Sequence, residues 1–136
     1  FFMKAKIYTD GGARGNPGPG GIGVVIKYND KILEFSKFIG NSTNNQAEYK
    51  AIILALEEAK ILKIQEIDFY SDSELIVNQL NRKYKIKNKD LSFLFIQVWN
   101  LSLNFKKITF THIPREQNKE ADKLVNQALD NLKSNQ

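Results

Sequence analysis

The stretch from Ile7 to Ile26 constrains the fold of this chain more than any other. Two runs of β-forming residues flank a linker with six glycines and two prolines, a composition that predicts a hairpin with a long, irregular turn. We expect Asp10 to close the first strand. An aspartate there either starts a turn or is held at a site, because an unpaired carboxylate is costly to bury. Taken alone, the position of Asp10 favours the turn.

Neighbouring residues extend this hairpin to three strands. Polar and apolar side chains alternate over Lys4–Thr9, and two more predicted strands follow at Ile22–Tyr28 and Ile32–Ile39. The Asn29–Asp30 pair between these two is typical of a tight hairpin turn. Because the links between the three runs are short, the sequence predicts an antiparallel meander.

A long amphipathic helix follows a polar break in the chain. Gln46–Leu62 has the apolar spacing of a helix, and Thr43 is placed to cap its first turn. Glu48 lies in the middle of the apolar face, where a glutamate is almost never buried without a partner. We therefore expect a cation beside Glu48. A solvated glutamate that interacts favourably with the helix dipole is the alternative.

A second aspartate follows the next predicted strand, Ile67–Ser71. This strand comes after a helix and is expected to run parallel to the first, so that Asp72 and Asp10 lie at the same edge of the sheet. Asp122 lies beside the apolar face of the last helix, a poor place for a merely solvated aspartate. The remaining elements are expected at Ser73–Leu80, Asp90–Leu101 (whose large apolar residues, Trp99 included, are interpreted as core), Lys107–Ile113 and Asn118–Leu132.

The composition excludes several classes of chemistry. The chain has no cysteine and a single histidine, His112, which excludes disulfides, a thiol nucleophile and any site that needs two histidines. We interpret His112 as a packed strand residue. No apolar run approaches the roughly 20 residues of a membrane span, and no leader is recognisable, so we expect a cytoplasmic protein without membrane contact.

Positive charge favours a polyanionic partner such as nucleic acid. The net charge is +5, and five basic residues lie between positions 81 and 89 around Tyr84. Such a run is either a solvated loop or a contact to a nucleic-acid backbone. The sequence does not separate these two interpretations.

Four carboxylates stand out, because each lies at a predicted strand end or on or beside an apolar helix face: Asp10, Glu48, Asp72 and Asp122. Brought together, they would repel one another, which raises their pKa values or requires cations. An all-oxygen ligand set suits Mg²⁺ or Mn²⁺ better than zinc. In a basic protein, such a cluster points to metal-assisted phosphodiester chemistry.

Four blocks of sequence carry a resemblance to a known family. They are Ile7–Gly12 with Gly15–Gly21, Thr43–Glu48, Tyr70–Ser73 and His112–Asp122. In this order and spacing the chain resembles type 1 ribonuclease H, in the short bacterial and archaeal form without an extra basic helix. The resemblance implies an α/β fold: a five-stranded mixed sheet in the order 3-2-1-4-5, with strands 1–3 as the antiparallel meander and helices on both faces.

The resemblance also implies an activity and a site. Family members are endoribonucleases that hydrolyse the RNA strand of RNA–DNA hybrids, leave 5′-phosphate and 3′-hydroxyl ends, and remove RNA primers and hybrids during DNA replication and repair. Two Mg²⁺ ions, for which Mn²⁺ is expected to substitute, would be held by Asp10, Glu48, Asp72 and Asp122, with Asp10 bridging both. Thr43 matches a contact to a DNA phosphate. Positions near RNA 2′-hydroxyl groups, which distinguish RNA from DNA, match Gly11, Gly12, Asn16, Asn44 and Asn45.

The chain departs from the family pattern in two places. Aligned on the His-Ile-Pro segment, Glu116 stands where many members have a loop histidine. Counted back from Asp122 without gaps, His112 takes that place instead, but we interpret it as a packed strand residue. Arg115 is then the nearest residue that could contact a phosphate or the leaving group as a catalytic residue. The missing basic helix leaves the lysine run to contact the substrate, through Lys83, Lys85, Lys87 and Lys89.

Other interpretations are an inactive binding relative, a fragment of a reverse transcriptase or transposase-like nuclease, and a glycosidase with paired carboxylates. The four acids disfavour the first, the position of Met3 directly before the first strand disfavours the second, and EDTA sensitivity would exclude the third. We expect a monomer with one domain over residues 3–133, Phe1 and Phe2 as additions from cloning, and a frayed tail over residues 134–136.

Overall fold

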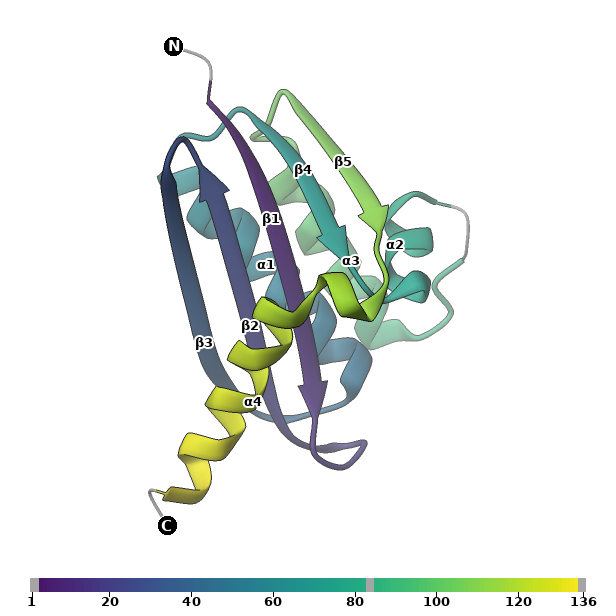
Figure 1. Ribbon diagram of the computed structural model, residues 1–136. Helices are drawn as coiled ribbons and strands as arrows, with labels where there is room; N and C mark the ends of the chain where they lie inside the picture. The colour runs from purple at the N-terminus through teal and green to yellow at the C-terminus, as the bar shows by residue number, and fades with distance from the viewer. Residues whose placement is uncertain (1–2, 83–84, 135–136) are drawn as a thin grey trace.

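The computed structural model describes residues 3–82 and 85–134. Its strands form one mixed sheet in the order β3-β2-β1-β4-β5 (Figure 1). The first three pair antiparallel, and β4 and β5 run parallel to β1. This confirms the predicted order and the predicted meander. The strands are β1 (Lys4–Ala13), β2 (Gly18–Tyr28), β3 (Lys31–Ser42), β4 (Glu66–Ser71) and β5 (Lys107–His112).

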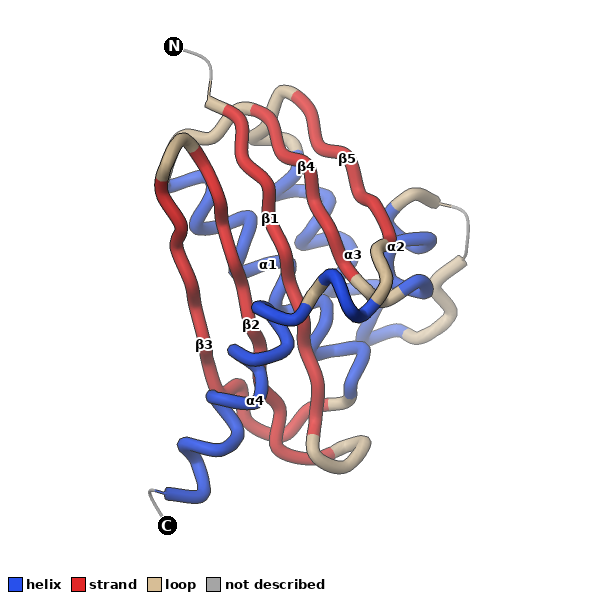
Figure 2. Tube along the Cα trace, viewed as in Figure 1, coloured by secondary structure: helices blue, strands red, loops and turns tan. Residues whose placement is uncertain are grey.

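Helices cover both faces of this sheet, as expected. Figures 1 and 2 show α1 and α3 behind the sheet and α4 crossing in front of it. The helices are α1 (Asn44–Ile61), α2 (Glu74–Leu80), α3 (Lys89–Ser102) and α4 (Lys119–Ser134), with a short 3-10 turn, η1 (Arg115–Gln117), before α4. Within the described residues, no helix is long and apolar enough to cross a membrane.

The core lies between β1, β2, β4 and helix α1. Along β1, alternate residues such as Ala5 and Ile7 are buried, as expected for a strand with one covered face. In β2, the adjacent residues Val24 and Val25 are both fully buried, because this strand is covered by α1 on one face and by α4 on the other. The layer order therefore fixes α4 directly over the strand next to β1.

Asp10 does not close a strand, which corrects the prediction. β1 continues to Ala13, and its last residues pair with Gly20 to Ile22 of β2. The glycine-rich stretch predicts a long turn, but all of its glycines except Gly15 lie in β1 or β2, which leaves only residues 14–17 as the connection. The turn is short because strand pairing continues wherever both backbones can approach, and glycine does not prevent this.

Two other local predictions are wrong. Trp99 is 43% exposed, because α3 packs on α1 through one side only, where Leu91 and Val98 are buried. The guanidinium of Arg82 lies over the outward-facing indole, 3.9 Å from its centroid. His112 is exposed rather than packed, because it is the last residue of the edge strand β5.

The predicted cap of α1 is confirmed. The hydroxyl of Thr43 accepts a hydrogen bond from the Gln46 backbone N–H at 3.1 Å, and the Gln46 side chain accepts one from the Thr43 N–H at 3.1 Å. This reciprocal pair satisfies two backbone donors at the start of the helix. It fixes the first turn of α1, which directly precedes Glu48.

Candidate active site: a carboxylate cluster at the edge of β1 and β4

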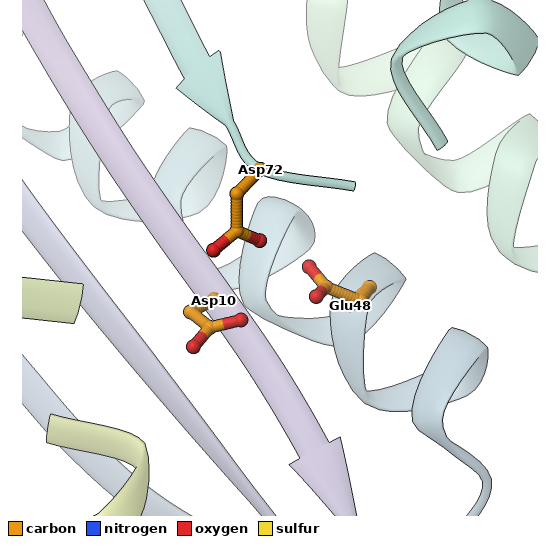
Figure 3. Close-up of side chains that lie close together, drawn as sticks. All are labelled: Asp10, Glu48 and Asp72. Carbon is orange, nitrogen blue, oxygen red and sulfur yellow. The ribbon is translucent and has the colours of Figure 1, made fainter. Parts of the chain in front are cut away.

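Asp10, Glu48 and Asp72 converge from three elements (Figure 3). One carboxylate oxygen from each residue lies within 4.8 Å of one from each of the others. The strand register explains the first pair, because Thr9 of β1 is opposite Ser71 at the end of β4. The next residues along the two parallel strands are Asp10 and Asp72. The predicted meeting of these two aspartates therefore occurs, although only β4 ends there.

Glu48 reaches the aspartates because α1 touches β1 at a glycine. A Cβ atom on Gly11 would lie 2.4 Å from the carbonyl carbon of Ala47 and 2.6 Å from the backbone nitrogen of Glu48. Only a residue without a side chain permits this approach. Glu48 is 8% exposed, so its predicted position on the buried face of the helix is confirmed.

The cluster strongly disfavours full ionisation in the absence of a cation. Burial, with repulsion from Asp72 and Asp122, raises the pKa of Asp10 from 3.8 to about 7. Burial and the neighbouring Asp10 raise the pKa of Glu48 well above its ordinary value of 4.5. Asp72 and Asp122 thus increase the cost of ionising Asp10, and Asp10 increases the cost of ionising Glu48.

The donor set fits a hard divalent cation. One carboxylate oxygen of Glu48, Oε2, is buried and has no hydrogen-bond partner among the described residues, and none of the ion pairs in this part of the chain involves Glu48. Such an orphaned oxygen is costly unless a ligand satisfies it. Three oxygen donors without histidine or cysteine favour Mg²⁺ or Mn²⁺ over zinc.

Asp122 lies next to this cluster and outside its closest set. It is half-buried in the first turn of α4, and its charge contributes to the raised pKa of Asp10. Gly23, which pairs with Asp10 across the β1–β2 ladder, permits the close approach of α4. A Cβ at Gly23 would collide with the carbonyl oxygen of Ala121. Gly11 and Gly23 therefore allow α1, which carries Glu48, and α4, which carries Asp122, to approach Asp10.

Asn118 lies next to the cluster, and the sequence predicts no role for it there. Its side chain is 1% exposed and donates a hydrogen bond from Nδ2 to the carbonyl oxygen of Thr9 at 2.9 Å. In the sequence, an asparagine before a helix indicates a cap. Its contact with β1 comes from the packing of two distant segments, and no local signal could have revealed it.

Four predicted substrate-binding residues surround a separate hollow of about 390 Å³. The side-chain oxygen of Asn16 accepts a hydrogen bond from the Asn44 N–H at 3.0 Å, and that of Asn44 accepts one from the Ala13 N–H at 2.9 Å. These bonds connect the β1–β2 loop to the start of α1. The residues lining the hollow are Asn16, Thr43, Asn44, Asn45 and Gln46, with Asn88, Asp90 and Leu91 from the start of α3.

The chain is similar to known proteins over most of its length. A family model described as reverse transcriptase-like matches residues 8–128. The ribonuclease HI of Halobacterium salinarum is 40% identical over 129 residues, which are 93% of this chain and 65% of that protein. The chain belongs to the ribonuclease H family.

This ribonuclease H family member also resembles larger proteins. The bifunctional protein Rv2228c of Mycobacterium tuberculosis is 40% identical over 131 residues, 94% of this chain and 36% of that protein. The chain thus spans between about a third and just under two thirds of these curated relatives. The solved structure of LC11-RNase H1 in complex with an RNA/DNA hybrid matches with a TM-score of 0.88 and 46% identity, over 94% of this chain and 98% of that one. The predicted family and fold are confirmed.

The other predicted site residues are more dispersed in this chain. Gly11 is buried against α1 and Gly12 is half-buried, whereas Lys85, Lys87 and Arg115 are exposed. Lys85 lines a second hollow of about 690 Å³ with Arg82 and Trp99. Lys83 lies outside the described residues. Members of this family are metal-dependent, and the acidic triad that such chemistry needs is present here.

The raised pKa of Asp10 predicts how the stability of the metal-free protein depends on pH. The folded state holds the Asp10 proton more tightly than the unfolded chain, so this contribution to stability is complete below about pH 3.8 and lost as pH rises through about 7. We expect the urea midpoint in EDTA to fall from pH 5 to pH 8, and Asp10→Asn to show a weaker fall. If the wild type had the same urea midpoint at pH 5 and at pH 8, the raised pKa of Asp10 in the folded protein would be contradicted.

Proposed function

We propose that this chain is an endoribonuclease that hydrolyses the RNA strand of RNA–DNA hybrids. The observation that carries the proposal is the close cluster of Asp10, Glu48 and Asp72, in which Glu48 is buried and has one orphaned carboxylate oxygen. Membership of the ribonuclease H family supports the reaction class, and the hybrid bound to LC11-RNase H1 supports the substrate. Hydrolysis adds water across the bond between phosphorus and the 3′ oxygen, which gives 5′-phosphate and 3′-hydroxyl ends.

Asp10, Glu48, Asp72 and Asp122 would hold two Mg²⁺ ions in this proposal. The ions would supply an activated water and stabilise the charge that develops on the departing 3′ oxygen. The protein's own contribution is preorganisation: β1, α1 and β4 hold three carboxylates together against their mutual repulsion. Asp122, whose charge acts on Asp10, would accept a proton from the attacking water.

The hollow beside Asn16 would select the RNA strand. Asn16, Asn44 and Asn45 offer amide groups that can hydrogen-bond to 2′-hydroxyl groups, which DNA lacks. Thr43 would contact a DNA phosphate through its remaining hydrogen-bonding capacity, because its hydroxyl already caps α1. The backbones of Gly11 and Gly12 would contact the same RNA strand. The burial of Gly11 leaves Gly12 the more accessible of the two.

The deciding experiment is cleavage of an end-labelled RNA–DNA hybrid in Mg²⁺, beside reactions with EDTA and with duplex DNA of the same sequence. We expect internal cuts in the RNA strand only, with 5′-phosphate products, and no cleavage in EDTA. Cleavage that persists in EDTA would exclude a metal-dependent nuclease. A hybrid that binds and stays intact in both Mg²⁺ and Mn²⁺ would identify a binding module instead.

The lysine run predicts a salt effect on binding. If Lys85 and Lys87 each contact a phosphate, Lys85→Gln/Lys87→Gln should weaken hybrid binding and reduce the slope of log K against log salt by about 0.9 per lost contact. Fluorescence anisotropy in EDTA measures binding without cleavage. Lys60→Gln/Lys63→Gln removes the same charge near the end of α1 and serves as the control. Equal slopes for the two variants would identify Lys85 and Lys87 as solvated loop residues.

Arg115 is proposed to contact the scissile phosphate or the leaving group from η1. Arg115→Ala is expected to lower kcat about tenfold, because a charge-assisted hydrogen bond to a phosphate is worth about 1.5–3 kcal/mol. Arg115→Lys should recover part of this loss, since it keeps the charge and loses the fork geometry. Steady-state kinetics decide, and an unchanged kcat in Arg115→Ala would remove Arg115 from the site.

A further inference from the structure

Asn118 connects two segments next to the carboxylate triad: β1, which carries Asp10, and the start of α4, which carries Asp122. Its side-chain Nδ2 donates to the carbonyl oxygen of Thr9 at 2.9 Å, one residue before Asp10. Its own carbonyl oxygen accepts the backbone N–H of Asp122 at 3.1 Å, the first such bond of α4. Asn118 therefore bonds both to Thr9, the neighbour of Asp10, and to the backbone of Asp122.

The geometry differs from that of an ordinary helix cap. A capping asparagine uses its side-chain oxygen to accept an N–H from the first turn of the helix. Here the side chain reaches β1 instead, and Asn118 Oδ1 is buried without a hydrogen-bond partner among the described residues. A buried polar atom in this state costs free energy. Stability alone therefore does not account for an asparagine at this position.

The segment before Asn118 has few other anchors. Residues 115–117 form the exposed turn η1, and the Asn118 N–H donates to the Arg115 carbonyl oxygen at 3.0 Å within that same turn. The bond from Asn118 to Thr9 is thus the polar connection of this turn that lies directly beside Asp10. The start of α4 is also held by the Lys27–Glu120 pair at 3.5 Å and by the bond from Ser36 Oγ to the Leu124 carbonyl oxygen at 2.6 Å. Loss of the Asn118 bond would therefore loosen the first turn of α4, which carries Asp122, without detaching the helix.

We infer that Asn118 is a positioning residue whose side chain fixes the start of α4 to β1 and thereby holds Asp122 beside Asp10. The inference rests on the proposed nuclease function, because that function gives Asp122 its role. Asn118 itself touches neither the substrate nor the triad. It acts on the reaction through Asp122 alone.

The first test measures the anchor without any catalysis. Native-state hydrogen exchange of the Asp122 amide is compared with that of Ile52 in α1, in metal-free protein. Asn118→Ala is expected to accelerate exchange at Asp122 at least about tenfold relative to Ile52. The matched control is Asn126→Ala, because Asn126 is an exposed asparagine of the same helix that donates to the Asp122 carbonyl oxygen at 3.2 Å. It should leave the ratio unchanged.

The second test is a double-mutant cycle on hybrid cleavage. Asn118→Ala should lower kcat about tenfold and leave KM for the hybrid within about twofold, whereas in an Asp122→Ala background it should cause no further loss. Residual cleavage in that background is measured at high enzyme concentration. Asn118→Asp cannot donate to Thr9 and is expected to lower kcat at least as much as alanine does.

Each result supports or overturns the inference separately from the proposed function. An unchanged Asp122 exchange ratio in Asn118→Ala would overturn the anchor, whether or not the chain cleaves hybrids. Equal losses in the wild-type and Asp122→Ala backgrounds would show a general structural role and overturn the action through Asp122. A wild-type chain that cuts no hybrid would refute the proposed function, and the exchange ratio alone would then decide the anchor.

Discussion

Asp10→Asn is expected to reduce hydrolysis of the hybrid by about 10³-fold or more. A bound divalent cation contributes several kcal/mol to such a reaction, which corresponds to this factor, and Asp10 lies at the centre of the residues that would hold it. The same variant should be more stable than the wild type in metal-free buffer near pH 8. It removes a carboxylate whose pKa is raised to about 7 by burial and by repulsion from Asp72.

The gain in stability is smaller than the pKa shift alone suggests, because Asp10 is only half-buried. We expect roughly 1–2 kcal/mol, or a rise in Tm of about 3–6 °C. Added Mg²⁺ should raise the Tm of the wild type and leave that of Asp10→Asn nearly unchanged. The difference in Tm between the two proteins should therefore become smaller or change sign. Thermal unfolding and single-turnover cleavage measure both effects on the same samples.

Asp68→Asn is the matched control. Asp68 is another aspartate of the central strands, but it pairs with Lys4 at 3.3 Å and accepts a bond from Thr109 at 3.1 Å. Its replacement should leave cleavage unchanged and bring no gain in stability. Near wild-type cleavage by Asp10→Asn would mean that the carboxylate triad is not the catalytic centre, whatever its effect on stability.

Gly11→Ala is expected to be among the most damaging substitutions outside the acids. The new methyl group would lie 2.4 Å from the carbonyl carbon and oxygen of Ala47, both backbone atoms that no rotamer change can move. α1 must therefore shift away from β1 and carry Glu48 with it. We expect a loss of about 3 kcal/mol in the free energy of unfolding and a fall in kcat of about 10²-fold, since small displacements of catalytic groups are costly.

Gly12→Ala is the control for Gly11→Ala, because it also replaces a glycine of β1 by alanine but creates no close contact. A Cβ at Gly12 would meet its nearest neighbours, Asn44 Oδ1 and Val125 Cγ1, at 3.9 and 4.0 Å, which are ordinary contacts. Its free energy of unfolding should stay within about 0.5 kcal/mol of the wild type. Urea unfolding measures both variants, and kcat is corrected for the folded fraction. Equal stability of the two would contradict the close packing of β1 on α1.

The triad was predictable because each of its acids breaks a local pattern. Glu48 interrupts an apolar helix face, and Asp72 directly follows a buried strand, so both invited an interpretation as site residues. Asp10 was found for a partly wrong reason, since its strand continues to Ala13. Asp10 and Asp72 still lie close together, as predicted, because this depends on the register of the parallel pairing between β1 and β4 and not on where β1 ends.

The sequence by itself determined the elements, the sheet order through family resemblance, and the acids of the triad, because periodicity and charged residues on apolar faces are local properties. Tertiary structure alone decided how closely those acids meet. The contact of Gly11 with α1, the contact of Gly23 with α4 and the bond from Asn118 to Thr9 each join segments distant in the chain. The exposure of Trp99 and His112 was decided in the same way. Burial depends on which elements cover a residue, and no local pattern encodes that.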